Sequence, residues 1–189
     1  MWGPSLIMIE PHQEITMLVL SGDVPKRESV IKTLALELGP TTMRDKFVVE
    51  TSDHAKLHLS VSYKWLFNVK RDDQVEGNKM FLVRDFVGNA CKSMASRIRG
   101  YVSTVPYKAF SQNYQQMIQD LLLKRDEAGK RHPFVFETNN LVIEDVNCDE
   151  GIVPVDKEIE ASLNRSLSLS FEIQNKAQKL AAEHSAQKL

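Results

Sequence analysis

The sequence predicts an α/β (α+β) domain in which an antiparallel sheet packs with helices, followed by a long amphipathic C-terminal helix. Three observations predict this fold. Apolar and polar side chains alternate over residues 53–67, whereas apolar side chains recur at three- and four-residue steps over residues 87–105. Residues 156–189 contain neither glycine nor proline. The first pattern is typical of a strand with one buried face, and the second and third are typical of helices.

The clearest predicted strand covers residues 53–67. Its odd positions are mostly apolar and are expected to face the core: Ala55, Leu57, Leu59, Val61, Tyr63, Trp65 and Phe67. Its even positions are mostly polar and are expected to face water, which favours an antiparallel sheet. Shorter apolar patterns predict strands at 15–20, before the turn residues 21–23, and at 33–38, before Gly39-Pro40.

Two helices are expected in the middle of the chain. Asp85 is a candidate N-cap for the first helix. Apolar residues recur along one side of this helix up to residue 105, and Pro106 then interrupts the helical pattern. A second helical pattern covers residues 110–121, and the charged segment 126–133 is typical of a loop. A return to strand is expected over residues 134–146.

The last segment predicts a helix that begins near Asp156 and still continues at Leu189. We therefore divide the chain into a domain at 1–155 and the start of a truncated helix at 156–189. At about 100° per residue, one side of this helix forms a candidate assembly seam. The seam residues are Ile159, Leu163, Ile173, Ala177, Leu180, Ala181 and His184.

Composition excludes several classes of protein. The 189 residues carry 24 Lys and Arg against 25 Asp and Glu, and this balance gives no long-range attraction to nucleic acid or anionic lipid. No apolar run approaches the roughly 18 residues of a membrane-spanning helix, and the N-terminus lacks the pattern of a secretory signal. Two cysteines are too few for a disulfide framework, so a reducing cytosol is expected.

The candidate chemical groups favour structural interpretations. His54 and His58 have the spacing of two metal ligands on a helix, but on a strand their β-carbons would be about 13 Å apart. Asp53 and His54, as neighbours on a strand, would point to opposite faces and cannot share a catalytic hydrogen bond. Cys91 lies on the apolar side of its helix, as a core residue would. We expect no catalytic residue, no metal ligand and no cofactor.

Two surfaces allow a binding interpretation. Lys92, Arg97 and Arg99 crowd one helix and could contact RNA or lipid headgroups, although a solvated helix face is favoured by the neutral net charge. The C-terminal helix could lie on a membrane. Its mixed charges and small seam residues favour packing against another helix instead.

Several stretches resemble the shoulder region of the major vault protein family. They include Trp2-Gly3-Pro4, Leu38-Gly39-Pro40 and the run from Glu50 to Leu57. The most specific stretch is Asp-Phe-Val-Gly-Asn-Ala-Cys-Lys at residues 85–92, and the resemblance continues through residues 95–100. The last part, with Pro154-Val155-Asp156 and residues 181–187, is similar to the start of the family's cap helix.

The resemblance implies a shoulder domain of the stomatin/prohibitin (band-7) type at 1–155, followed by the start of the cap helix. It implies a structural, self-assembling subunit of the vault ribonucleoprotein particle and not an enzyme. Many copies would stand side by side as a homo-oligomer in the cytoplasm, with a minor nuclear fraction. Vault RNA, a telomerase-associated protein and a poly(ADP-ribose) polymerase are the particle partners that the resemblance implies. DNA is not among them, and contact with lipid rafts stays open.

A second class of function also stays open. Stomatin-like proteins are membrane-associated scaffolds in which the band-7 domain itself touches lipid. A hydrophobic hairpin or acylation segment before the domain would favour that class, and residues 1–10 contain neither. Body repeats before the domain would favour the shell subunit.

Overall fold

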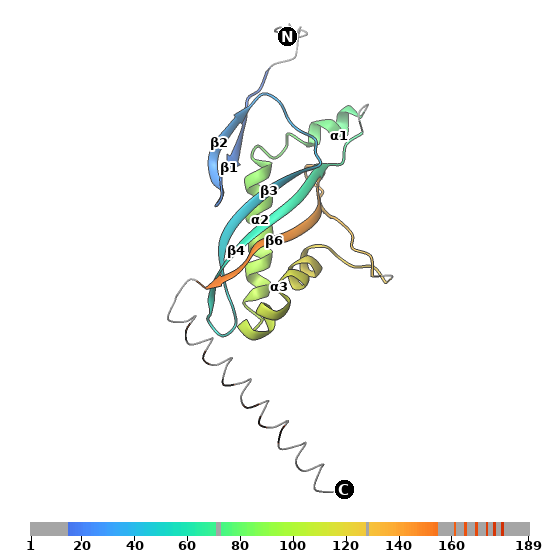
Figure 1. The fold of residues 1–189 in the computed structure, drawn as a ribbon. Coiled ribbons are helices and arrows are strands. Elements are labelled where there is room, and N and C mark those ends of the chain that lie inside the picture. The colour runs from blue at the N-terminus through green and yellow to red at the C-terminus, as the bar shows by residue number, and fades with distance from the viewer. Residues whose placement is uncertain are drawn as a thin grey trace, which may run out of the picture.

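The computed structural model describes residues 15–70, 73–127 and 129–154, together with Ala161, Arg165, Leu169, Ile173, Lys176 and Lys179. Over the described residues up to 154, the elements are two antiparallel sheets and three helices (Figure 1). The strands are β1 (Leu18–Gly22), β2 (Arg27–Thr33), β3 (Thr41–Glu50), β4 (Lys56–Phe67), β5 (Phe134–Phe136) and β6 (Leu141–Pro154). The helices are α1 (Gln74–Lys79), α2 (Phe86–Val102) and α3 (Tyr107–Leu122).

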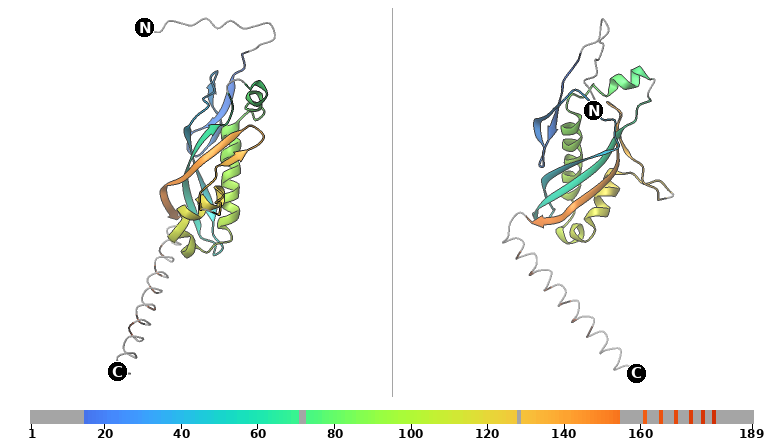
Figure 2. Two further views of the ribbon diagram at one scale, coloured as in Figure 1. Left: turned by 90° about the vertical axis from the view of Figure 1, so that its right-hand side faces the viewer. Right: turned by 45° about the horizontal axis from the view of Figure 1, so that its top comes forward.

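The larger sheet has the strand order β3-β4-β6-β5, and all of its neighbouring strands are antiparallel. The helix α2 runs along one face of this sheet, and α3 lies against β6 and α2 (Figures 1 and 2). No described helix covers the opposite face, which is turned toward the viewer in Figure 1. We call this uncovered side the open face. The predicted fold class, an antiparallel sheet packed with helices, is confirmed.

The core lies between α2 and the sheet. Leu57, Leu59 and Val61 of β4 are completely buried, as their alternation predicts. From α2, Met94 and Ile98 pack against them at the expected helical spacing and are equally buried. Trp65, Phe67 and Phe86 form an edge-to-face aromatic cluster at one end, with ring centroids 5.0–5.6 Å apart. Aromatic contacts of this kind contribute about 0.5–1.5 kcal/mol each beyond burial.

Some side chains on the open face are more buried than the alternation predicts. Ser60 and Ser62 occupy even positions of β4 and are nevertheless buried. Because β4 is a central strand, side chains of β3 and β6 flank these two short side chains on both sides. The Ser62 hydroxyl also donates a 2.8 Å hydrogen bond to Asp149 of β6.

Three local predictions differ from the structure. Residues 34–38 connect β2 to β3 without forming a strand, because only Leu36 of the three alternating leucines packs against the core. The single strand expected over 134–146 is a hairpin, in which a turn at 137–140 separates β5 from β6. Asn140 ends that turn with φ at 56°, a left-handed conformation that asparagine adopts more readily than most residues.

His54 also differs from its prediction. It does not lie on the strand but in the turn before β4, with φ at 63°, and its Nδ1 lies within hydrogen-bonding distance of a Glu50 carboxylate oxygen, at 2.8 Å. The geometric argument against a shared metal assumed that both histidines lie on one strand, so its premise is wrong for His54. The helix α1 was not predicted, because its six residues contribute nothing to the buried core.

Candidate assembly surfaces and the hairpin–shoulder junction

The hairpin of β1 and β2 is held to the main domain by the carboxylate of Asp85. The backbone N–H of Ser21 donates to Asp85 Oδ1 at 2.9 Å, and the Ser21 hydroxyl donates to Oδ2 at 2.6 Å. The same carboxylate accepts a 2.9 Å hydrogen bond from the backbone N–H of Gly88 and thereby caps α2, as the sequence predicts. One side chain therefore begins the helix and attaches the hairpin.

Gly88 is required at this attachment because side-chain oxygens of Asp85 and Ser21 lie against it. A β-carbon at Gly88 would lie 2.5 Å from the Ser21 hydroxyl oxygen. Real β-carbons do not come so close to another heavy atom, so a larger residue would displace the Asp85 and Ser21 side chains and disturb the hydrogen bond between them.

A second carboxylate holds the turn of the hairpin. Asp45 of β3 is buried and accepts a 2.9 Å hydrogen bond from the backbone N–H of Lys26, in the turn between β1 and β2. An exposed ion pair between Lys92 of α2 and Glu28 of β2, at 2.6 Å, adds a third connection. An isolated two-stranded hairpin is marginal in water. These contacts, together with the buried Leu20, therefore determine where the hairpin lies.

The environment of Asp85 lowers its pKa below the usual 3.8. Partial burial of the carboxyl group raises the pKa. Hydrogen bonds from the Ser21 hydroxyl and from the backbone N–H groups of Ser21 and Gly88 lower it, and they outweigh the burial. The junction therefore favours the charged carboxylate.

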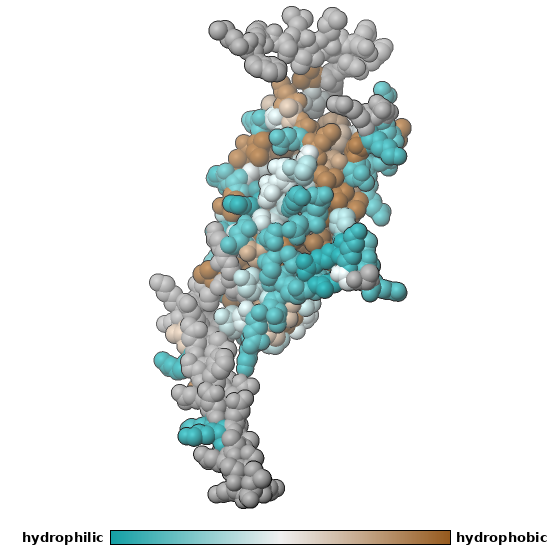
Figure 3. Space-filling model, turned by 45° about the vertical axis from the view of Figure 1, so that its right-hand side comes forward, coloured by the Kyte–Doolittle hydropathy of each residue, from teal (hydrophilic) through white to brown (hydrophobic). Residues whose placement is uncertain are grey.

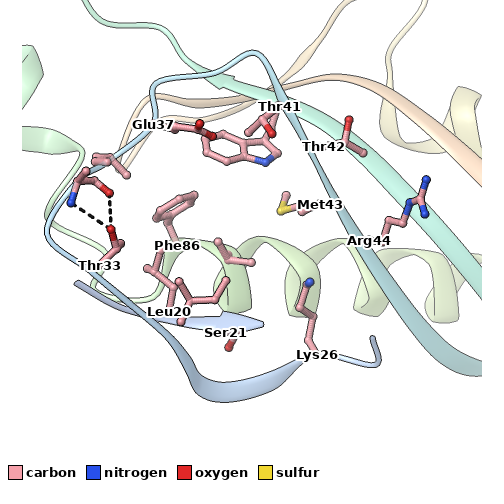
Figure 4. Close-up of a pocket in the computed structure, with 15 residues that line it drawn as sticks. Leu20, Ser21, Lys26, Thr33, Glu37, Thr41, Thr42, Met43, Arg44 and Phe86 are labelled. Atoms are coloured by element: carbon pink, nitrogen blue, oxygen red, sulfur yellow. Dashed lines mark hydrogen bonds between the residues drawn. The ribbon is translucent and has the colours of Figure 1, made fainter. Parts of the chain in front are cut away.

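A cavity of about 620 Å³ lies between the hairpin, the 33–37 connection and the main domain. In Figure 4, Leu20, Met43 and Phe86 project into it from β1, β3 and α2. Trp65 of β4 completes the apolar wall. Glu37 lies at one end of the cavity, and Lys26 and Arg44 lie at the other (Figure 4). We call this space the junction cavity.

Side chains cover parts of both open edges of the larger sheet, which are β3 and the stretch of β6 that β5 does not pair with. On the β6 edge, Gln115 of α3 accepts a 2.8 Å hydrogen bond from the backbone N–H of Cys148, and Gln119 donates to the carbonyl of Val146 at 2.9 Å. On the β3 edge, Arg99 Nε donates to the carbonyl of Val48 at 3.0 Å. Open edges invite pairing with other strands, and these contacts oppose it.

The basic residues of α2 have local structural roles. Lys92 pairs with Glu28, as described above. Arg97 lies over the ring of Phe134 at 4.7 Å from its centroid, and Arg99 lies over Phe47 at 5.1 Å. Such cation–π contacts use the guanidinium groups to cover aromatic rings. These contacts agree with the expectation of an ordinary helix face.

The candidate chemical groups have structural surroundings. Cys91 is buried, and this burial raises its pKa to about 12, so the thiol is neutral at physiological pH. The carboxylate of Asp53 accepts hydrogen bonds from the Thr51 hydroxyl and from the backbone N–H of Tyr107. Within the described part of the chain, no three His, Cys, Asp or Glu residues gather as a metal ion would require. Among the same residues, no helix is both long and apolar enough to cross a membrane.

Comparison with known proteins gives these features a context. A family model described as "Shoulder domain" matches residues 39–156, and one described as "Major Vault Protein Repeat domain" matches residues 1–38. Over the whole chain, the sequence is 44% identical to "Major vault protein alpha" of Dictyostelium discoideum and 41% identical to "Major vault protein" of Danio rerio. It is 39% identical to "Major vault protein" of Trypanosoma cruzi over 96% of the chain.

The chain belongs to the major vault protein family. It spans about a fifth of the length of these relatives, 22% in each case. The two family matches meet between Leu38 and Gly39, just before β3. The contacts of Asp85 and Asp45 therefore join the repeat-matched hairpin to the shoulder-matched domain. This boundary lies inside the first predicted unit, and the division into 1–155 and 156–189 stays a prediction.

The predicted assembly seam lies almost entirely outside the described residues. Ile159, Leu163, Ala177, Leu180, Ala181 and His184 are not among them. Ile173 is described, is helical and is 67% exposed. The seam stays a prediction.

Sequence reasoning missed an exposed apolar surface around α1. It consists of Leu38, Val75, Phe81 and Leu82, which we call the α1 surface. Leu38 and Phe81 line one groove of about 440 Å³ beside α1. Figure 3 shows hydrophobic residues gathered over the upper part of the molecule and hydrophilic residues over much of its lower part. The adjacent pair Phe81-Leu82, in a segment without strand or helix periodicity, is the sequence signal that could have indicated this surface.

Proposed function

We propose that this chain is the shoulder part of a structural shell subunit, not an enzyme, in the vault ribonucleoprotein particle. Relatives named major vault protein along the whole chain carry the proposal. The junction supports it, because two carboxylates of the shoulder-matched domain hold the repeat-matched hairpin in one orientation. A wall that changes direction between its body and its cap needs such a rigid joint.

Many copies stand side by side in the proposed particle. Each copy presents one face to the neighbour on its left and a different face to the neighbour on its right, and this heterologous contact closes into a ring. The side chains that cover parts of the sheet edges favour lateral contact through side chains over the addition of strands between copies. The predicted helix after Val155 adds the proposed seam from Ile159 to His184.

We also assign the shoulder to the stomatin/prohibitin (band-7) fold class. A sheet with helices on one face supports this assignment. The vault RNA, the telomerase-associated protein and the poly(ADP-ribose) polymerase enter the proposal as partners of the whole particle. The proposed location is the cytoplasm, with a minor nuclear fraction.

The test is expression of the full-length protein alone, followed by negative-stain microscopy. Barrel-shaped particles of uniform size are the expected result. A vesicle flotation assay in parallel examines the alternative, a stomatin-like membrane scaffold. Full-length protein that stays monomeric, or that floats with vesicles and forms no particles, would contradict the proposed function.

A further inference from the structure

We propose that Ser29 of β2 is a phosphorylation site for a serine kinase that selects basic residues. Its phosphate group binds Lys92 and thereby holds the hairpin against α2. This inference goes beyond the proposed function, because it concerns the joint within one chain and needs no second copy. Three features carry it, which are the residues that precede Ser29, the irregular backbone at Ser29 and the groove that Ser29 lines.

The residues around Ser29 form a charge pattern of the kind that basophilic kinases select. Lys26 and Arg27 precede it by three and two positions, and the apolar Val30 follows it directly. No other serine or threonine of the sequence has basic residues at both of these positions. Kinases distinguish substrates by such charge patterns. The Arg27 side chain is 73% exposed and pairs only with the exposed Asp23, so this weak pair can give way to acidic groups of a kinase.

The backbone at Ser29 departs from regular strand geometry. The pairing of β1 and β2 shifts at this point, so that residues 28–30 of β2 stand opposite the single residue Ser21. Ser29 lies in the middle of this bulge with φ at 61°, a left-handed value that few residues other than glycine adopt. Its side chain is exposed, and within the described strands β2 pairs only with β1. A kinase therefore reaches Ser29 without displacing β1.

Ser29 also lines a groove between the hairpin and the start of α2. The groove has a volume of about 360 Å³, and its other lining residues are Val19, Glu28, Asp85, Gly88, Asn89 and Lys92. Ser29, Asn89 and Lys92 are exposed, so the groove is open to solvent. A phosphate group on Ser29 therefore lies beside the first turns of α2.

This place suits an additional anion. Lys92 already binds a carboxylate of the hairpin, because its ammonium group lies 2.6 Å from Glu28. The groove adjoins the N-terminus of α2, a helix of 17 residues, where the helix dipole favours negative charge. A phosphoserine carries about −1.5 to −2 charges at pH 7 and three acceptor oxygens. Lys92 therefore binds the phosphate more strongly than it binds Glu28, and it connects α2 to the hairpin through this contact.

Asp85 opposes the phosphate, but its effect is the smaller one. Its two carboxylate oxygens already accept hydrogen bonds from Ser21 and Gly88. Its repulsion of the phosphate acts across an open groove that salt and water screen, whereas the Lys92 ammonium forms a direct charge-assisted hydrogen bond. Glu28 is 71% exposed and is free to turn into solvent. The phosphate therefore tightens the junction.

The modification is a phosphoryl transfer from ATP. The hydroxyl oxygen of Ser29 forms a bond to the γ-phosphorus, and the bond from this phosphorus to the bridging oxygen of ADP breaks. The hydroxyl proton passes to a carboxylate base of the kinase, and ADP leaves. The chain itself contributes the acceptor hydroxyl and the basic residues that the kinase binds.

The first experiment tests the site in the folded 189-residue chain. The chain is incubated with ATP and the catalytic subunit of a cyclic-AMP-dependent protein kinase, and mass spectrometry should locate one phosphate on Ser29. Lys26→Gln combined with Arg27→Gln should lower the initial rate by at least about ten-fold. The control is Lys32→Gln, at an exposed position of the same strand outside the pattern, and it should leave the rate unchanged. Modification of Ser29 only after unfolding in urea, or equal rates in all three chains, would overturn the assignment of the site.

The second experiment tests the contact with Lys92. Phosphorylation should slow hydrogen exchange several-fold at the amide of Ser21, which donates to Asp85. The amide of Cys148, which Gln115 binds at the β6 edge, should exchange at an unchanged rate. Lys92→Gln should be phosphorylated normally but should lose the slowing at Ser21. Exchange at Ser21 that stays equal or becomes faster, or slowing that persists in Lys92→Gln, would overturn the contact. Neither experiment depends on particle assembly, so the proposed function stands or fails separately.

Discussion

The carboxylate of Asp85 binds Ser21 through both the backbone N–H and the hydroxyl of that residue, although 64 positions separate the two in sequence. The same carboxylate caps α2 through Gly88. The start of the main helix and the position of the hairpin therefore depend on one side chain.

Replacing Asp85 should destabilise the protein strongly. Asp85→Ala removes a helix cap and leaves the polar groups of Ser21 without their partner, so we expect a loss of about 2–4 kcal/mol in the free energy of unfolding. The matched control is Asp73→Ala, which removes the cap of α1, a helix without buried residues. The control should cost less than about 1 kcal/mol. Urea denaturation measures both, and equal losses would contradict a role for Asp85 beyond capping.

The contribution of Asp85 should depend on pH. Because its pKa is lower in the folded protein than the usual 3.8, the carboxylate stabilises the fold at pH values above about 4. This contribution is lost as the pH falls through the folded-state pKa. The difference in unfolding free energy between the unmodified protein and Asp85→Asn should therefore be larger at pH 7 than at pH 3. A difference that stays constant over this range would contradict the linkage.

The buried face of β4 should not tolerate a charge. Leu59 is completely buried, so Leu59→Asp places an unpaired carboxyl group in the core and should cost more than about 3 kcal/mol. The neighbouring His58→Asp is the control, because His58 lies exposed on the open face. That change should stay within about 0.5 kcal/mol. An unchanged melting temperature for Leu59→Asp would refute the assignment of the buried face.

Removing the side chain that closes the β6 edge should have a measurable cost. Gln115→Leu keeps the approximate shape but leaves the backbone N–H of Cys148 without its acceptor, at a cost of about 1–3 kcal/mol. It should also speed hydrogen exchange at the Cys148 amide. Gln116→Leu, on the same helix, loses only an exposed contact with Asp120 and should be nearly neutral. Equal exchange rates in the two variants would argue against edge closure by Gln115.

The proposed seam makes a prediction for assembly. The 189-residue chain should be mostly monomeric in dilute solution, because part of a ring contact cannot supply the stability of the whole. In the full-length protein, Ala177→Arg or Ala181→Arg should reduce particle yield by placing a long charged side chain in a close-packed seam. Glu183→Arg, on the opposite side of the predicted helix, is the control for charge. Normal assembly of both seam variants would rule out helix-to-helix contact there.

Local patterns in the sequence determined the main elements of the core. The alternation in β4 and the spacing in α2 follow from the two backbone geometries, so Leu57, Leu59, Met94 and Ile98 were placed correctly without knowledge of the fold. Asp85 was predicted as a helix cap for the same reason, because capping depends on residues three positions apart. The resemblance to the vault family likewise rests on contiguous runs such as 85–92.

Only the tertiary structure decided the features that join distant parts of the chain. No local signal pairs Ser21 with Asp85, Lys26 with Asp45 or Gln115 with Cys148, since each contact needs both partners brought together by packing. The burial of Ser60 and Ser62 depends on β4 having a neighbour on each side, which its own sequence does not encode. The junction cavity exists for the same reason. It is a space between two elements, and its walls come from β1, β3, β4 and α2, which only the folded chain brings together.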